Sequence, residues 1–88
     1  MHEAHVLNDL MRRLEQLSKE NGGAKIRSIR VRLGALSHFT VAHFREHFEE
    51  ASPGTAAHGA RLDVTLMTDI HDADAQRICL ESAEIDEV

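Results

Sequence analysis

The sequence predicts an α/β (α+β) fold, in which two helices pack on one face of a three-stranded mixed sheet. Segments 3–21 and 40–51 repeat apolar residues every three or four positions, which is the spacing of one helical face. Segments 25–33 and 61–68 alternate apolar and polar residues, as half-buried strands do, and a third strand is expected within 76–88. The predicted order is therefore α-β-α-β-β.

The first helix is expected to bury one apolar stripe and to end at glycines. The sequence Asn21-Gly22-Gly23 follows it, and these residues accept the left-handed conformation that closes helices. The leading end carries unpaired N–H groups and partial positive charge, which Glu3 can offset. A capping role and a metal-ligand role for Glu3 are left equally open. The stripe consists of Val6, Leu7, Leu10, Met11, Leu14 and Leu17.

The second helix is expected to pack against the same face of the sheet. Ser37 or Thr40 is expected to cap its start through a hydroxyl group. In the third strand the apolar parity shifts between Leu80 and Ile85, which predicts a β-bulge near Ser82. The apolar stripe of the helix is Val41, Phe44, Phe48 and Ala51, and the buried side of the second strand is Leu62, Val64 and Leu66. The other sheet face, expected to be solvated, carries Arg30, Arg32, Asp63, Thr65 and Glu81.

Size and composition predict one small domain over residues 1–88 with an aliphatic core, because there is no Trp or Tyr and only three Phe. A formal charge of −5 argues against nucleic acid, which calls for a basic face. The sequence has no run of eighteen apolar residues, so no membrane span is expected. It also lacks a basic segment followed by an apolar one, so no signal peptide is expected. The single cysteine, Cys79, fits a reduced, cytoplasmic setting.

The amino terminus, Met1-His2-Glu3-Ala4-His5, groups metal-donor atoms. The Met1 α-amine, the His2 amide nitrogen and the His2 imidazole can close adjoining chelate rings around one small cation. Such donors suit late divalent ions, and tetragonal nitrogen geometry favours Cu(II) or Ni(II). Glu3 and His5 add further donors. This terminus is therefore the first candidate metal site, although a frayed terminus without function is the common alternative.

Seven histidines lie scattered along the chain, and two of them form a second candidate. His43 and His47 are four apart on the second helix, so their imidazoles can share one face, although such pairs are usually incidental without a third ligand. His38 is placed to add a ligand to either cluster. No hydrolase, metalloprotease or phosphate-loop pattern occurs, and Cys79 is interpreted as a core or interface residue rather than a reactive thiol. No enzymatic activity is expected.

Several separated motifs, taken in order, resemble the HypA/HybF family. They are Met1-His2-Glu3 at the start, Gly34-Ala35-Leu36-Ser37 after the first strand, Phe44-Arg45 and Phe48-Glu49 in the second helix, and the stretch from Gly54 to Val64. The family comprises nickel metallochaperones for maturation of [NiFe]-hydrogenase and, in some organisms, of urease. The resemblance runs from residue 1 to about residue 67, and the last strand is similar to the family's closing strand.

The resemblance implies Ni(II) bound by the Met1 α-amine and His2, with Glu3 beside them. The family often has an acidic residue at the position of Thr40, so His38 or His5 is expected to complete the ligand set. The implied partners are the hydrogenase large subunit and other maturation proteins, such as a nickel-delivery GTPase. A homodimer through a sheet edge or the open sheet face is compatible with the sequence.

The family normally carries a zinc domain with two Cys-x-x-Cys pairs between the last two strands. This sequence has only residues 68–76 there, and Cys79 with His71 cannot supply four ligands, so no zinc and no zinc domain are expected. Two functions follow from this departure. The chain either carries nickel at its amino terminus and passes it to a partner, or it serves as an interaction module of the hydrogenase or its maturation complex without metal delivery.

Overall fold

The expected order of helices and strands is confirmed by the computed structural model, which describes the backbone of residues 2–86 and the side chains of residues 7–86. The elements are α1 (His2–Glu20), β1 (Ile26–Leu33), α2 (Val41–Ala51), β2 (Arg61–Leu66) and β3 (Ile78–Ile85). The predicted bounds differ from these mainly at strand ends, where alternation continues for a residue or two beyond the last sheet hydrogen bond. No helix among the described residues is both long and apolar enough to cross a membrane.

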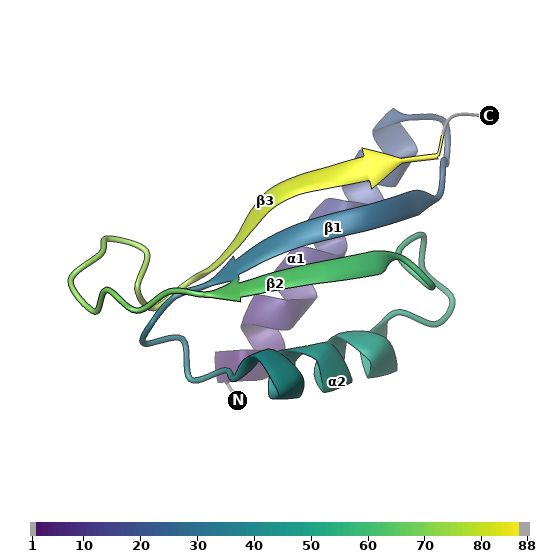
Figure 1. Ribbon diagram of the computed structural model, residues 1–88. Coiled ribbons are helices and arrows are strands. Elements are labelled where there is room, and N and C mark those ends of the chain that lie inside the picture. Colours follow the sequence, from purple (N-terminus) through teal and green to yellow (C-terminus); the bar gives the residue numbers. More distant parts are fainter. Residues whose placement is uncertain (1, 87–88) are drawn as a thin grey trace.

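The sheet is mixed and has the strand order β2-β1-β3. β1 pairs in parallel with β2 and antiparallel with β3. A parallel pair needs a crossover, and α2 supplies it between β1 and β2. Both helices lie on the same face of the sheet, with α1 running diagonally behind the strands (Figure 1). Among the residues that the structure describes, no element covers the opposite face of the sheet.

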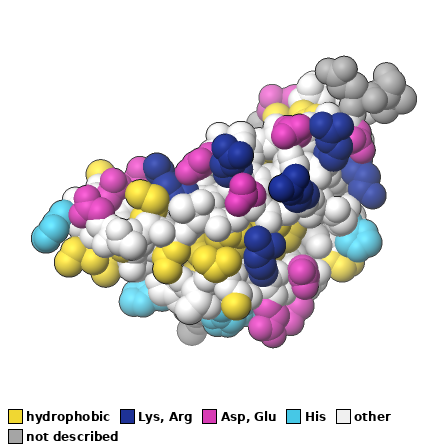
Figure 2. Space-filling view, viewed as in Figure 1, with side chains coloured by type: hydrophobic (Ala, Val, Ile, Leu, Met, Phe, Trp, Pro, Cys, Tyr) yellow, Lys and Arg dark blue, Asp and Glu magenta, His cyan; other side chains and the backbone are white. Residues whose placement is uncertain are grey.

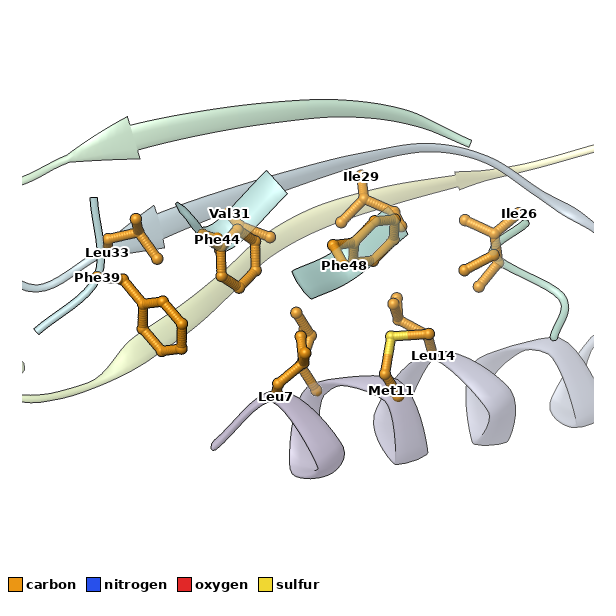
Figure 3. Close-up of a cluster of buried hydrophobic side chains, with 12 residues drawn as sticks. Leu7, Met11, Leu14, Ile26, Ile29, Val31, Leu33, Phe39, Phe44 and Phe48 are labelled. Atoms are coloured by element: carbon orange, nitrogen blue, oxygen red, sulfur yellow. The ribbon is translucent and has the colours of Figure 1, made fainter. Parts of the chain in front are cut away.

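The core lies between the sheet and the two helices (Figure 3). Phe44 in α2 and Leu14 in α1 have no exposed surface, and Val31 and Leu33 of the central strand are equally enclosed. The predicted stripe of α1 is confirmed at Leu7, Leu10, Met11 and Leu14, and that of α2 at Phe44 and Phe48. α1 ends where Ser18, itself buried, donates a hydrogen bond of 2.6 Å to the Ala24 carbonyl.

The β-bulge expected near Ser82 is present. Arg30 pairs with Ser82 but Val31 pairs with Leu80, so one extra residue of β3 is accommodated between the two pairs. A second irregularity, which the sequence pattern did not reveal, lies between Ile26 and Ser28 of β1. It allows Ile26 and Ile29, an odd number of positions apart, to face the same core.

The open sheet face is polar, as expected, and its charges alternate in sign (Figure 2). Cross-strand ion pairs join Arg27 to Glu84 at 2.9 Å and Arg30 to Asp63 at 3.6 Å. The hydrogen bond from Arg27, together with a weaker contribution from Ser28, holds the pKa of Glu84 below its ordinary value. These pairs are solvent-exposed, so they specify register more than they add stability.

Leu66 differs from its predicted environment, and for Cys79 the core alternative is wrong while the interface alternative stays a prediction. Leu66, expected on the buried side of β2, is 44% exposed, because it ends the strand next to a connection that extends away from both helices (Figure 1). Cys79 is half-buried and pairs across the sheet with Arg32, so it belongs to the open face rather than to the core. The alternation of β3 explains this, since its neighbour Leu80 packs against the core.

The connection between β2 and β3 folds back onto the end of β1. The Gly34 amide donates to the Arg77 carbonyl at 2.8 Å, and the Leu36 amide donates to the Ala75 carbonyl at 2.6 Å. Ala75 is buried at this contact. The connection is therefore anchored to the end of β1 through Ala75 and Arg77, while residues 68–73 are exposed.

Candidate metal-binding end of the domain

The starts of α1 and α2 lie at the same end of the molecule. In Figure 1 the start of α1 lies near the start of α2, and in Figure 3 Leu7 of α1 lies on the same side of the core as Phe39, which precedes the cap of α2. Leu7 and Phe39 both belong to the buried core cluster. We call this the amino-terminal end of the domain, because most of the candidate ligands named from the sequence attach to it.

The first candidate site begins at a helix terminus. α1 starts at His2, so the backbone of His2, Glu3 and His5 is helical. The first four N–H groups of a helix have no partner within it, which leaves the amide of His2 free of helical hydrogen bonds. Met1 and the side chains of His2, Glu3 and His5 lie outside the described residues. Their role as ligands therefore stays a prediction.

The start of α2 is fixed by two local interactions. The Thr40 hydroxyl accepts a hydrogen bond of 3.0 Å from the His43 amide, so Thr40 is the N-cap, one of the two capping residues expected. Phe39 packs edge-on against Phe44, with the ring centroids 5.6 Å apart. Apolar residues just before the cap and four positions after it form a hydrophobic staple, which sets the direction in which the chain enters the helix. The other capping candidate, Ser37, has a buried hydroxyl with no hydrogen-bond partner among the described residues.

Replacing Thr40 with Ala is expected to lower the free energy of unfolding by about 1 kcal/mol, because the His43 amide loses its acceptor at the helix start. Urea denaturation followed by circular dichroism measures this change. Thr40→Ser retains the hydroxyl and is the matched control, with an expected change of a few tenths of a kcal/mol at most. Equal losses of stability in Thr40→Ala and Thr40→Ser would show that the hydroxyl group does not stabilise the start of the helix.

His38 lies in the loop that leads into α2. It has a φ of 68°, the left-handed region that few non-glycine residues occupy, and its side chain is exposed. It precedes Phe39 and is thus tethered to the amino-terminal end of the domain. The role of His38 as a ligand there stays a prediction.

The two histidines of α2 are brought together. The Nε2 atoms of His43 and His47 lie 2.9 Å apart, and their ring centroids are separated by 4.5 Å. Phe39 lies beside both imidazoles, with centroid separations of 6.1 Å from His43 and 6.3 Å from His47. Within the described residues no three His, Cys, Asp or Glu side chains converge as a metal cluster, so His38 does not join this pair.

Phe39 is the contributor that the sequence analysis missed. It is buried, with 5% of its surface exposed, and it packs on one phenylalanine and two histidines of α2. The signal was present, since an apolar residue stands directly before Thr40 and another stands four residues after it. That spacing marks a staple, and a staple places the residue before the cap alongside the first turns of the helix.

The fold is that of a small α+β protein, with two helices packed on a three-stranded mixed sheet and the starts of both helices at one end. A family model described as "Hydrogenase/urease nickel incorporation, metallochaperone, hypA" matches residues 1–85. The chain therefore belongs to the HypA family, as the resemblance of its motifs indicated.

Three curated relatives carry the name hydrogenase maturation factor HypA. The protein of Methylocella silvestris is 34% identical over 67 residues, covering 76% of this chain and 59% of the relative. That of Nitrosospira multiformis is 30% identical over 64 residues, covering 73% and 56%. That of Acidithiobacillus ferrooxidans is 27% identical over 84 residues, covering 96% and 69%. The chain thus matches only a little over half the length of the first two.

Proposed function

We propose that this chain binds Ni(II) as cargo at its amino terminus and passes it to a partner in hydrogenase maturation. The principal ligands are the α-amine of Met1 and the imidazole of His2, with Glu3 beside them and His38 or His5 as a further ligand. The observation that carries the proposal is the HypA family match, which begins at residue 1 and so includes Met1-His2-Glu3.

The chemistry of the donors supports nickel over harder cations. Amine, amide and imidazole nitrogens suit late first-row divalent ions, whereas Mg²⁺ and Ca²⁺ prefer oxygen ligands. The free amide at the start of α1 adds a nitrogen that the helix itself does not use. A bound ion would release the protons of the amine and the imidazole, so affinity should fall below pH about 8, the reference pKa of an α-amine, and more steeply below about 6.5, that of histidine.

A site at a chain end is suited to transfer. In this proposal an incoming partner replaces the ligands one at a time. The partners proposed are the hydrogenase large subunit or another maturation protein, including a nickel-delivery GTPase. We also propose that the protein is cytoplasmic and is not an enzyme.

We further propose that nickel transfer here proceeds without a zinc domain between β2 and β3. The support is the connection itself, residues 67–77, which is short and packs against Gly34 and Leu36. Its one neighbouring thiol, Cys79, pairs with Arg32 on the open sheet face. In this proposal any cargo metal is held at the amino-terminal end of the domain.

His2→Ala is expected to weaken Ni(II) binding at the amino terminus at least about tenfold, equal to about 1.4 kcal/mol, because it removes one principal ligand. Isothermal titration calorimetry on untagged protein beginning at Met1 measures this change. Acetylation of the α-amine should weaken binding similarly, since it removes the other ligand.

His58→Ala is the matched control, because His58 is also exposed but lies in the connector before β2. Its nickel affinity should equal that of the parent protein. Unchanged affinity in both His2→Ala and the acetylated protein would overturn the proposal. If the His2→Ala and acetylated proteins also captured the hydrogenase large subunit as the parent protein does, the interaction-module alternative would be supported instead.

A further inference from the structure

We propose that His43 and His47 form a second metal site, on the surface of α2, for a divalent ion in tetragonal coordination such as Ni(II) or Cu(II). The two Nε2 atoms serve as neighbouring ligands, and water fills the remaining positions. This site uses none of the amino-terminal ligands, so it stands or falls independently of the proposed function.

The geometry of the pair fits such an ion in two separate measures. With metal–nitrogen bonds of about 2.05 Å at a right angle, two imidazole nitrogens lie about 2.9 Å apart and the ring centroids about 4.5 Å apart. The structure has Nε2 atoms 2.9 Å apart and centroids 4.5 Å apart. A tetrahedral ion would need nitrogens about 3.3 Å apart, so the pair favours tetragonal ions.

The centroid separation also excludes a pair whose two nitrogens point straight at one another. If the two nitrogens pointed directly at one another, the ring centres would lie farther apart than the observed 4.5 Å at the same nitrogen separation. The rings are inclined at 57°, and their nitrogens lie off the line between the ring centres. Each lone pair is thus inclined to that line, as two ligands of one ion must be.

The ligands are held in place before an ion arrives. Phe39, itself buried, lies beside both imidazoles and restricts their rotation. The Thr40 cap and the buried Phe44 fix the turn that carries His43. Ligands that are already ordered lose little conformational entropy on binding, and this strengthens a site that has only two protein ligands.

The site should bind weakly and exchange quickly, because no third His, Cys, Asp or Glu side chain among the described residues joins it. Both properties fit a surface site that acquires and releases late transition metals. Imidazole pairs bind Ni(II) and Cu(II) in preference to Mg²⁺ or Ca²⁺. His43 and His47 lie on the helix that begins at the amino-terminal end of the domain, where the proposed cargo site also lies (Figure 1).

The test titrates NiCl₂ into full-length protein carrying His2→Ala, which removes the proposed amino-terminal site. Calorimetry gives the affinity, and histidine side-chain NMR reports which rings are broadened by the paramagnetic ion. We expect the His43 and His47 ring signals to broaden first, and His47→Gln to weaken this binding at least tenfold.

The decisive control keeps the number of histidines constant while breaking their spacing. His47→Gln combined with Arg45→His leaves two histidines on α2, but residues two apart do not face each other on a helix. This double variant should bind as weakly as His47→Gln, whereas His58→Gln should bind like its parent. Equal affinity in the parent and the double variant, or broadening of His58 and His71 before the pair, would overturn the proposal.

Discussion

Phe44→Ala should lower the free energy of unfolding by about 3–5 kcal/mol, the usual loss for a fully buried phenylalanine. Phe44 has no exposed surface, and its ring contacts Phe39 and Phe48 at centroid separations of 5.6 and 6.4 Å. The substitution opens a cavity where α2 meets the sheet (Figure 3). A domain of this size has about 5–15 kcal/mol in total, so this loss is a large fraction of its stability.

Urea denaturation followed by circular dichroism measures the loss, and two variants calibrate it. Ile70→Ala removes a side chain that is 54% exposed and should change stability by no more than about 0.5 kcal/mol. Phe44→Leu keeps most of the volume and should lose less than Phe44→Ala. Similar losses for Phe44→Ala and Ile70→Ala would contradict the position of the core.

Periodicity was sufficient to predict the fold because each element has one buried side. The repeat through Leu7, Leu10 and Leu14 and the alternation through Ile29, Val31 and Leu33 specify which faces meet. Leu66 was placed wrongly because alternation predicts the sheet face on which a side chain lies, but not how far along that face the helices extend. The bulge in β1 was missed because an odd spacing such as Ile26 to Ile29 resembles a break in the pattern.

The sequence predicted only those features of the candidate sites that follow from the spacing of nearby residues. His43 and His47 could be paired from a helix period, but their separation depends on rotamers that Phe39 restricts. Phe39 stands outside the helix, so the helix period does not include it, but the staple around Thr40 predicts its position. His38 could be placed near the start of α2 from sequence, but its left-handed backbone could not be predicted there.

The close approach of residues 74–75 to Gly34 could not be predicted, because it joins a strand end to a loop about forty residues away. A Cβ atom at Gly34 would overlap the backbone oxygens of Asp74 and Ala75, which cannot move as a flexible side chain would. The motif Gly34-Ala35-Leu36-Ser37 was noted for its resemblance to a family. Its physical meaning here is a contact with the connection between β2 and β3.

Gly34→Ala should therefore lower the free energy of unfolding by about 1–3 kcal/mol, the usual cost of forcing extra volume into a packed site. The added methyl group should push the connection away from β1 and break the hydrogen bonds from the Gly34 amide to Arg77 and from the Leu36 amide to Ala75. Urea denaturation gives the total loss, and hydrogen exchange should show faster exchange at residues 34 and 36.

Gly23→Ala separates this effect from backbone strain. Gly23 has a φ of 80° and no atom near its Cβ position, so its substitution costs about 1–2 kcal/mol through the left-handed conformation alone. Its effect should stay at the end of α1 and leave exchange at Leu36 unchanged. Faster exchange at Leu36 in Gly34→Ala only would establish that the short connection is anchored to the end of β1. Unchanged exchange there in both variants would mean that the connection is not anchored at Gly34.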